Sequence, residues 1–436
     1  MSRRAVLRAA AAAGAGALAA CAGSGPTESQ PAPSAAGGTV EFWYAGLGQT
    51  FIEAYQAMAK SMTERNPTIT VSVQGQQGFP DKVIVSFAGG SAPDSFNIQL
   101  IDALTFLPKG IYEPLDAPIK THRYDLKALW PGLAEQYQYQ GKQLVLWANI
   151  TTTVTYYNAD LFKQNDLPAP NDLAAQRRWT WDTALESARK LSREDRFGFW
   201  TLTTPQALQP WLWMNGGKGF DREENPTRVT MSLPESLAAM EWQHALRNRY
   251  RVAPTPNQIM ELGTPQQQFY NGRLAMFTEQ SNVEATERGV RGAANFRWDI
   301  APLPAGPKGL FGFIGGQSIG VTTQAKAKEA ALEWLFHVAG PSGQKELIKR
   351  QIGLPVIKSL IDSPEWKQAP SAPPHVNVVV DMLVRARPIA RTNLWRPLAT
   401  NAFNPYITKM NNGEVTAKEA CAMIDDLGTK TIAAGG

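Results

Sequence analysis

Cysteine and histidine are scarce in this chain of 436 residues, which has two cysteines and four histidines. Cys21 lies in a leader segment that predicts its acylation, as described below, and an acylated Cys21 could not pair with Cys421. The histidines are widely scattered, and none stands at metal-ligand spacing from another histidine, a cysteine or a carboxylate. We therefore expect no disulfide, no metal and no cofactor.

Catalytic and phosphate-binding motifs are also missing. The chain has no G-x-S-x-G nucleophile motif and no Walker-type phosphate loop. Gly312 to Gly316 is rich in glycine, but no lysine follows at phosphate-loop spacing, which favours a turn or a close approach of backbones. No pair of carboxylates stands out for glycoside hydrolysis, although such pairs are assembled in space. The sequence thus nominates no catalytic residue.

Excess positive charge is small outside the leader. The formal net charge is +5, but residues 1–20 contain three arginines and no acid, so removing them lowers the net charge to +2. This gives no electrostatic argument for nucleic acid as a partner. After the leader, no apolar run approaches the roughly 20 residues that a membrane-spanning helix needs.

The first 38 residues are typical of an export signal followed by a tether. Arg3-Arg4 resembles a twin-arginine signal, and Ala9 to Ala20 has the length of a signal-peptide core. Leu18-Ala19-Ala20-Cys21 resembles the lipobox of bacterial lipoproteins, in which Cys21 is acylated. Ala22 to Gly38 is rich in Gly, Ser, Pro and Ala and predicts a flexible tether. We expect a signal peptide over 1–20, a lipidated Cys21 with a tether over 21–38, and anchoring to the extracytoplasmic face of the cell membrane.

The next segments alternate between strand and helix patterns. Strands are predicted at Thr39–Tyr44, Thr68–Val73 and Ser95–Gln99, and helices at Phe51–Arg65 and Asp81–Ala88. This order predicts an α/β sheet with parallel strands. Ligands bind beyond the carboxyl ends of such strands. Those ends are 43–44, 97–99 and 147–151.

Residues 144–162 change character halfway. An apolar run gives way to the polar, threonine-rich segment from Asn149 to Thr155. Branched side chains favour an extended strand. We interpret the segment as a strand that leaves one core and enters another beside a polar cleft, with an ordinary amphipathic edge strand as the alternative.

Eight short landmarks are spread over the chain after the tether, at 89–94, 110–116, 156–162, 179–182, 215–217, 269–276, 315–318 and 413–420. In this order, after an opening strand that ends at Trp43, they resemble the extracellular solute-binding proteins of carbohydrate-uptake ABC transporters, the family that includes maltose-binding protein. The resemblance covers nearly all of the chain beyond the tether.

The resemblance implies an α/β fold of two lobes, the periplasmic-binding-protein fold, with a mostly parallel sheet flanked by helices in each lobe. Three crossovers near 149–153, 279–282 and 338–341 would form the hinge. Lobe 1 would comprise 39–150 and 283–338, and lobe 2 would comprise 151–282 and 339–436. The implied function is that of a monomeric, lipid-anchored receptor that closes on a sugar and delivers it to the permease subunits of an ABC importer.

Sugar ligands require amides and hydroxyls for their hydroxyl groups and aromatic rings for their C–H faces. The candidates of these types near the expected cleft are Trp43, Tyr44, Asn97, Gln99, Trp147, Asn149, Thr151, Trp211, Trp213, Asn215, Gln280, Asn282, Gln317 and Trp395.

The tryptophans among these candidates each have an alternative role in the core. Trp395 stands where the family often places a stacking aromatic, and we expect ligand contact, with core packing as the alternative. Trp211 and Trp213 would share one side of an extended segment, and at least one is expected to pack. For Trp43, cleft and core are equal alternatives.

Two departures from the family pattern argue against maltose as the ligand. Leu47-Gly48 replaces an Asp-Lys pair of maltose-binding protein, and Asn282 stands where an aromatic is frequent. The expected cleft is nearly free of charge, which favours a neutral sugar or oligosaccharide. The alternatives are a receptor of the same fold for a non-sugar solute and a secreted carbohydrate-active hydrolase.

Overall fold

The computed structural model describes residues 37–45, 48–282, 294–350, 352–367 and 373–435. The predicted signal peptide, Cys21 and the tether up to residue 36 lie outside these ranges. Within them, every helix is too short or too polar to cross a bilayer. The same ranges contain no group of three His, Cys, Asp or Glu side chains that could hold a metal ion.

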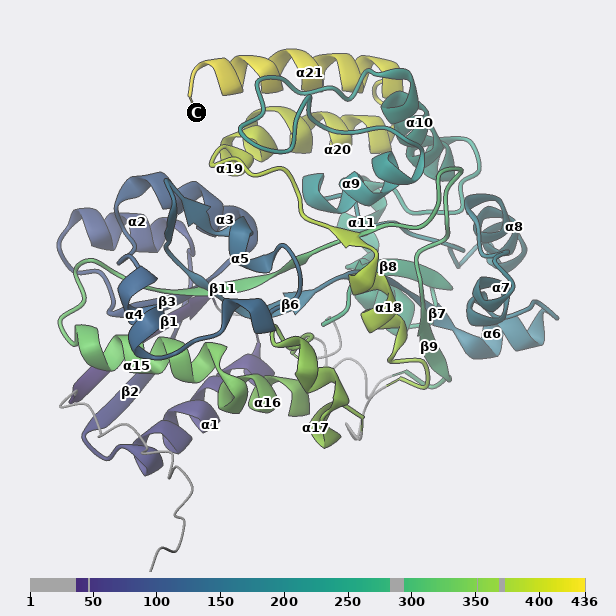
Figure 1. Ribbon diagram of the computed structural model, residues 1–436. Coiled ribbons are helices and arrows are strands. Elements are labelled where there is room, and N and C mark those ends of the chain that lie inside the picture. Colours follow the sequence, from purple (N-terminus) through teal and green to yellow (C-terminus); the bar gives the residue numbers. More distant parts are fainter. Residues whose placement is uncertain (1–36, 46–47, 283–293, 351, 368–372, 436) are drawn as a thin grey trace, which may run out of the picture. The chain divides into compact units, whose positions relative to one another are not determined.

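The first sheet has five strands in the order β2-β1-β3-β11-β6. Their bounds are Ile69–Gln76, Gly38–Ala45, Ser95–Gln99, Gly315–Val321 and Leu146–Thr151. β1 is parallel to β2 and β3, whereas β11 is antiparallel to both β3 and β6. The sheet is therefore mixed, because a strand from late in the chain is inserted at its centre (Figure 1). The expectation of a mostly parallel sheet holds only for β1–β3.

Both faces of this sheet are covered, so its strands are apolar on both sides. Phe42 and Tyr44 pack in one core with α1 (Gln49–Arg65) and α15 (Lys328–Ala339), while Trp43 belongs to the other core, together with residues of α3 (Leu100–Phe106). This division follows from the alternation of side chains along a strand. α2 (Asp81–Ala88) lies on the α3 side in Figure 1. Short elements complete this region, namely α4 (Asp116–Thr121), α5 (Leu133–Gln136), β4 (Gln138–Tyr139) and β5 (Lys142–Gln143).

The second sheet has the strand order β8-β7-β9, with bounds Met276–Gln280, Thr153–Asn158 and Trp298–Ala301. All its pairings are antiparallel. The prediction of a mostly parallel sheet is wrong for this second sheet, because each neighbouring pair of its three strands runs in opposite directions. Around it lie α6 (Ala159–Gln164), α7 (Pro170–Ala175), α8 (Trp181–Leu191), α9 (Pro205–Met214), α10 (Pro234–Asn248), α11 (Pro256–Leu262), α12 (Pro265–Tyr270) and α18 (Val378–Val384).

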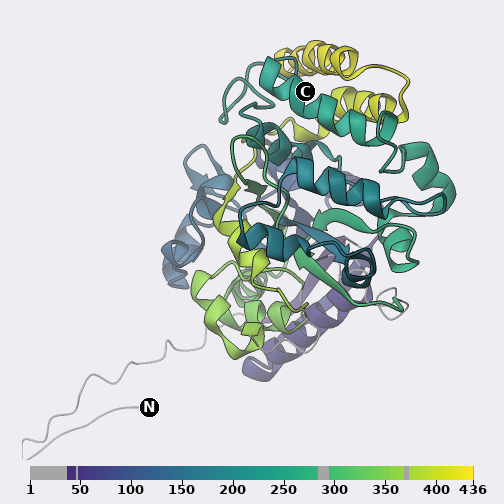
Figure 2. The ribbon, with the colours of Figure 1, turned by 90° about the vertical axis from the view of Figure 1, so that its right-hand side faces the viewer.

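The C-terminal helices pack on α10 on the side of the second sheet, as Figures 1 and 2 both show. They are α19 (Trp395–Leu398), a π-helical turn (Ala399–Phe403), α20 (Asn404–Asn412) and α21 (Ala417–Ala433). α21 begins with a capping box in which Thr416 and Glu419 bond each other's backbone N–H groups. A two-stranded ribbon of β10 (Gly312–Phe313) and β12 (Ala386–Arg387) precedes them.

The chain first passes between the sheets where the sequence predicts it. β6 ends at Thr151 in the first sheet and β7 begins at Thr153 in the second. The interpretation of residues 144–162 as an extended segment that leaves one part of the fold and enters another is confirmed, because β6 pairs in the first sheet and β7 pairs in the second. Thr152 is the only residue between them.

Two other segments lie elsewhere than the predicted lobe boundaries place them. β9 was assigned to lobe 1 but pairs with β7 of the second sheet. α16 (Pro341–Lys349) was assigned to lobe 2 but packs on α1 and α15, as does the following α17 (Pro364–Lys367) on α16. Strand pairing and helix packing decide both positions, and neither leaves a signal in local periodicity. The remaining boundaries stay a prediction.

Candidate functional site

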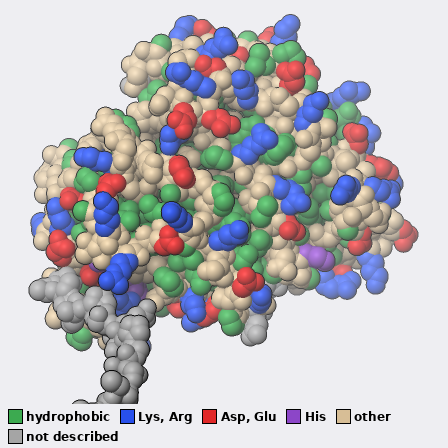
Figure 3. Space-filling model, in the orientation of Figure 1, with side chains coloured by type: hydrophobic (Ala, Val, Ile, Leu, Met, Phe, Trp, Pro, Cys, Tyr) green, Lys and Arg blue, Asp and Glu red, His purple; other side chains and the backbone are tan. Residues whose placement is uncertain are grey.

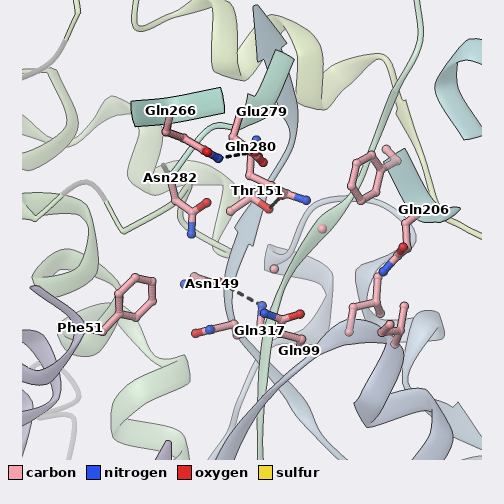
Figure 4. A pocket seen from close by; sticks show the side chains of 15 residues that line it. Phe51, Gln99, Asn149, Thr151, Gln206, Gln266, Glu279, Gln280, Asn282 and Gln317 are labelled. Carbon is pink, nitrogen blue, oxygen red and sulfur yellow. Dashed lines mark hydrogen bonds between the residues drawn. The ribbon is translucent and has the colours of Figure 1, made fainter. Parts of the chain in front are cut away.

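A cavity of about 260 Å³ opens where the two sheets meet. Side chains from both sheets reach it: β3, β6 and β11 contribute from the first sheet and β8 from the second (Figure 4). The start of α9 and α12 complete the wall. The cavity lies beyond the carboxyl ends of β3 and β6, as expected for an open α/β sheet.

Carboxamides dominate the lining of this cavity. Seven of its fifteen residues carry an amide, and these are Gln99, Asn149, Gln206, Gln266, Gln280, Asn282 and Gln317. Each amide offers two N–H donors and a carbonyl acceptor without carrying charge. Thr151 adds a hydroxyl group. Such a wall can bind a ligand that both donates and accepts hydrogen bonds.

Asn149 fixes the floor of the cavity. Its Oδ1 accepts a bond from the backbone N–H of Gln317 at 3.0 Å, and its Nδ2 donates to the carbonyl of Ile352 at 3.1 Å. Gly316 makes this contact possible, because its φ is +132° and a Cβ there would lie 2.3 Å from the Asn149 carbonyl oxygen. The close backbone approach expected in Gly312–Gly316 is therefore confirmed.

Hydrogen bonds join the two sheets beside the cavity. The Thr151 hydroxyl bonds Oε1 of Gln280, and the backbone N–H of Ser281 donates to the Thr152 carbonyl at 2.8 Å. The Tyr156 hydroxyl donates to the Gln280 carbonyl at 3.2 Å. Gln280 is thus held at the point where the chain passes between the sheets.

The described residues that line the cavity include a single ionisable side chain. Glu279 is 8% exposed, and its carboxylate accepts 2.8 Å bonds from Nε2 of Gln266 and the backbone N–H of Gln280. None of the fifteen described lining residues is Lys, Arg or His. A phosphate or carboxylate ligand would therefore find no cationic partner on this wall.

Two buried side-chain carbonyl oxygens in the cavity lining lack a hydrogen-bond donor among the described residues. Oε1 of Gln317 and Oε1 of Gln206 are shielded from solvent and have no hydrogen-bond partner among the described residues. A buried polar atom without a partner costs about 1–3 kcal/mol. A ligand hydroxyl placed against either oxygen would remove this cost.

Apolar groups complete the wall. Phe51 and Phe313 contribute aromatic rings, and Leu100 and Ile101 contribute aliphatic side chains at the start of α3. Rings of this kind accept the C–H face of a ligand, while the amides bind its polar groups. The cavity therefore suits a hydroxyl-rich ligand without net charge.

Six of the fourteen predicted ligand-binding residues line this cavity: Gln99, Asn149, Thr151, Gln280, Asn282 and Gln317. All six are polar. Their contact with a ligand stays a prediction, but the structure brings them together. The other eight lie elsewhere.

Trp395, predicted to stack on a sugar, lies in the core instead. It has no exposed surface, its Nε1 donates to the Ala390 carbonyl at 2.7 Å, and its ring meets Phe220 edge-on at 5.2 Å. The alternative of core packing applies, because α19, which begins at Trp395, packs against the π-helical turn, α3 and α21, and Trp395 does not line the cavity.

Four further candidates near the strand ends are buried away from the cavity. Trp43 bonds Glu41 through Nε1, Asn97 bonds the Tyr55 hydroxyl, and Trp147 bonds the Leu133 carbonyl, each at 2.8 Å. Tyr44 is 2% exposed beside Tyr55. The side-chain N–H groups of Trp43, Asn97 and Trp147 thus have internal acceptors, as buried donors usually do.

The extended segment predicted around Trp211 and Trp213 is wrong, because both lie in helix α9. Trp211 is 1% exposed and packs against Trp181 and Trp242. Trp213, two positions later, points to the other side of the helix. Asn215 follows the helix and donates to the Glu235 carbonyl at 2.7 Å. Pro210 lies inside this helix. Because proline disfavours a helix interior, the sequence did not indicate a helix here.

Nine lining residues were not predicted: Phe51, Leu100, Ile101, Gln206, Gln266, Glu279, Phe313, Gly315 and Gly316. Glu279 adjoins the predicted Gln280, and the glycines lie in the segment already expected to make a close approach. Gln206 and Gln266 sit near the starts of two helices. Only the folded chain brings those helix starts to the ends of the strands.

Arg396 links the helices of the two sheets outside the cavity. From α19 it donates to both carboxylate oxygens of Asp81 at 2.6 and 3.0 Å, and its Nε lies 3.6 Å from Asp102 of α3. The Asp102 side chain is 15% exposed. Burial raises the pKa of Asp102 to about 6, although the positive charge of Arg396 acts in the opposite direction.

Asp102→Asn should remove part of the pH dependence of stability. The pKa of an unfolded aspartate is about 3.9. Because folding raises the pKa of Asp102, its stabilising contribution is complete below about pH 4 and is lost as the pH rises through about 6. Urea unfolding of both proteins from pH 4 to 7 measures this effect. An unchanged slope over that range would contradict the assignment to Asp102.

The chain matches known proteins over most of its length. A family profile described as bacterial extracellular solute-binding protein matches residues 56–374. The galactooligosaccharide-binding protein of Bacillus subtilis (strain 168) is 23% identical over 296 residues, which cover 65% of this chain and 65% of that protein, just under two thirds of its length. The sn-glycerol-3-phosphate-binding periplasmic protein UgpB of Escherichia coli (strain K12) is 23% identical over 345 residues, or 74% of this chain and 75% of UgpB.

Solved structures share the fold. An ABC substrate-binding protein from Listeria monocytogenes in complex with cycloalternan superposes with a TM-score of 0.81 at 23% identity and covers 91% of this chain and 99% of its own. This likeness shows the two-lobe periplasmic-binding-protein fold, with the two sheets as the centres of the lobes. Because the family profile spans well over half of the sequence, the chain belongs to the bacterial extracellular solute-binding proteins.

Proposed function

We propose that the protein is the extracytoplasmic substrate-binding component of an ABC importer and that it binds a neutral sugar or oligosaccharide. The observation that carries this proposal is the cavity wall, which combines seven carboxamides and two aromatic rings with no cationic side chain among the described lining residues. Sugar hydroxyls both donate and accept hydrogen bonds, which matches amide groups. The galactooligosaccharide-binding relative supports the same ligand class.

The relative UgpB is named for sn-glycerol 3-phosphate, which makes a phosphate ester the second candidate. A buried phosphate needs charge-assisted donors, because desolvating an unpaired charge is very costly. In this cavity the only ionisable group among the described lining residues is the carboxylate of Glu279, which would repel the phosphate. The sugar is therefore the favoured ligand.

Binding is coupled to closure of the lobes in this proposal. The amides of Gln99 and Gln317 belong to the first sheet, while Gln280 belongs to the second. A ligand that bonds both sets has higher affinity for the closed form and shifts the population toward it. The closed form would then dock on the permease subunits as a monomer.

A thermal-shift screen tests the proposal. The mature chain from residue 21, with Cys21→Ser to keep it in solution, would be heated with neutral mono- and oligosaccharides and with sn-glycerol 3-phosphate. A ligand at 100 times its dissociation constant stabilises the folded state by about 2.7 kcal/mol. We expect at least one neutral sugar to raise the melting temperature and the phosphate ester to leave it unchanged. Stabilisation by the phosphate ester alone would contradict the proposal.

The proposal includes a lipid anchor at Cys21 and export by the twin-arginine route, both of which lie outside the described residues. In cells, Cys21→Ser should move the protein from the membrane fraction to the soluble fraction. Protein that stays with the membrane would contradict the anchor.

We also propose that the protein has no enzymatic activity. No acid–base pair lies in the cavity, where Glu279 is the one carboxylate among the described lining residues. A glycosidase generally needs two carboxyl groups. Release of shorter products from oligosaccharides incubated with the purified protein would overturn this part of the proposal.

A further inference from the structure

An ion-pair network joins the two lobes outside the cavity. Arg396 of α19 donates to both carboxylate oxygens of Asp81 in α2, at 2.6 and 3.0 Å, and its Nε lies 3.6 Å from Oδ1 of Asp102 in α3. α19 belongs to the C-terminal helices on the side of the second sheet, whereas α2 and α3 cover a face of the first sheet (Figure 1). The guanidinium and the two carboxylates therefore belong to different lobes.

The geometry of this network is specific to one arrangement of the lobes. A bidentate pair forms only when the planar guanidinium faces both carboxylate oxygens. The Asp81 side chain is 69% exposed, but those of Arg396 and Asp102 are 31% and 15% exposed, and the attraction of charges strengthens as water is excluded. Lys82, beside Asp81 in the sequence, bonds Gln76 instead and does not compete with Arg396.

A second arginine from the same segment also reaches the first lobe. Nη1 of Arg391 donates to the carbonyl of Glu135 in α5 at 2.7 Å. Nη2 of Arg391 lies 2.7 Å from Oε1 of Glu224, in the loop between α9 and α10 of the second lobe. This ion pair fixes Arg391 on its own lobe while it bonds the other. Residues 391–396 thus make polar contacts with the first lobe at two places.

Helix α3 connects the network directly to the cavity. The helix begins at Leu100, and both Leu100 and Ile101 line the cavity. Asp102, which faces Arg396, is the next residue of the helix. Successive residues of an α-helix are separated by about 1.5 Å along its axis, so Asp102 moves together with this part of the cavity wall. Separation of α3 from α19 would therefore break the network and widen the cavity in one movement.

We infer that Arg396, Asp81 and Asp102 form a latch that favours the closed arrangement of the two lobes and thereby raises the affinity of the cavity for its ligand. The inference rests on the proposed function, because closure of the lobes is part of it. None of the three residues lines the cavity. They are positioning residues, which act through the fraction of molecules that is closed, since a ligand that binds only the closed form has an apparent affinity proportional to that fraction.

Pulsed electron-spin resonance between two labels tests the latch without any ligand. The labels are placed at Lys109→Cys, which follows α3, and at Lys418→Cys in α21, both exposed positions, in the mature chain with Cys21→Ser. The native Cys421 is buried and stays unlabelled. Arg396→Met and Asp81→Asn should each raise the ratio of long to short distances at least about threefold.

Two further variants separate a latch from a general structural role. The double variant Arg396→Met with Asp81→Asn should shift the distances no more than Arg396→Met alone, because both changes remove the same pair. Arg396→Lys should restore part of the short-distance population, because lysine keeps the charge but cannot bond both carboxylate oxygens in a planar fork. Additive shifts in the double variant would contradict a direct pair between the lobes.

Arg297→Met is the matched control. Arg297 bonds Asp160 through Nε and Nη2, at 2.7 and 2.6 Å, but both residues belong to the second lobe. Its loss should leave the distances unchanged. If Arg396→Met fails to fold, Asp81→Asn decides the test, because the Asp81 side chain is largely exposed. Native-like distances in Asp81→Asn and in every folded Arg396 variant would overturn the latch.

Calorimetric titration then tests the effect on affinity. The probes are maltotriose, β-1,4-galactotriose and β-1,4-mannotriose. For a sugar that binds the native protein, Arg396→Met should raise the dissociation constant in proportion to the loss of the closed population, and Arg297→Met should leave it unchanged. An unchanged constant in Arg396→Met, despite longer distances, would overturn the effect on affinity. Absence of binding by all three sugars would count against the proposed function, whereas the latch is decided by the distances measured without ligand.

Discussion

Trp395→Ala is expected to lower the free energy of unfolding by about 3–5 kcal/mol, the usual cost of removing a buried tryptophan. Trp395 has no exposed surface and packs against Phe220 and Phe403. The variant also leaves the Ala390 carbonyl without the indole N–H that it now accepts. Chemical unfolding without ligand measures the loss. Sugar affinity of the fraction that still folds should be unchanged, because Trp395 does not line the cavity.

Two controls make this result interpretable. Trp395→Phe should cost less, since it keeps most of the packing and loses the hydrogen bond. Tyr406→Ala, at an aromatic that packs only partly buried against the edge of the same core, should cost less than Trp395→Ala. If Trp395→Ala unfolds at the same denaturant concentration as the native protein but loses its ligand-induced stabilisation, then Trp395 faces the ligand and its place in the core is wrong.

Gln317→Leu is expected to weaken sugar binding by about tenfold or more without destabilising the free protein. Oε1 of Gln317 is buried without a partner among the described residues, so leucine of similar size removes an unsatisfied acceptor. The backbone N–H of Gln317 still donates to Asn149 in the variant, which keeps the cavity floor. We expect a ligand hydroxyl to donate to this oxygen in the native protein, and the variant would lose that bond. Unfolding of the free protein and calorimetric titration measure the two effects.

Gln136→Leu is the matched control for this variant. Gln136 is 6% exposed and its Nε2 also lacks a partner among the described residues, but it lies in α5 and does not line the cavity. It should leave sugar binding unchanged. If Gln317→Leu bound sugar as tightly as the native protein, the acceptor would have no role in recognition.

The polar candidates were more predictable from sequence than the aromatic ones. Asn149 and Thr151 follow from a strand end and from the change of character along residues 144–162, which local patterns reveal, whereas Gln317 follows from the family resemblance of residues 315–318. The positions of Trp43, Trp211 and Trp395 could not be predicted in this way. All three are buried, and the local sequence does not distinguish a tryptophan that faces a cleft from one that is buried beneath it. Burial is a property of the assembled helices and not of the segment that carries the side chain.

The arrangement of strands in the sheets was also only partly predictable from the sequence. The first crossing between the sheets, at Thr152, is visible as a switch from apolar to threonine-rich strand. The insertion of β11 between β3 and β6 is not visible, since it joins residues that are more than 150 positions apart. The amides of Gln206 and Gln266 reach the cavity only because their helices begin beside it. Long-range pairing of this kind carries no local signal.

Figure 3 shows acidic and basic side chains interspersed over the face it displays, without a field of one sign. A charged ligand would gain little long-range attraction from that face. This agrees with recognition by hydrogen bonding inside the cavity rather than by electrostatic attraction.

We propose that the amide-lined cavity selects an uncharged, hydroxyl-rich ligand. Competition calorimetry tests it most directly: a neutral sugar that stabilises the protein is titrated in the absence and in the presence of a large excess of sn-glycerol 3-phosphate. We expect one binding site for the sugar and the same dissociation constant in both titrations, because the described residues that line the amide-rich cavity include no cation to hold the phosphate ester. Displacement of the sugar by sn-glycerol 3-phosphate, in a protein that still contains Gln317 and Glu279, would contradict it.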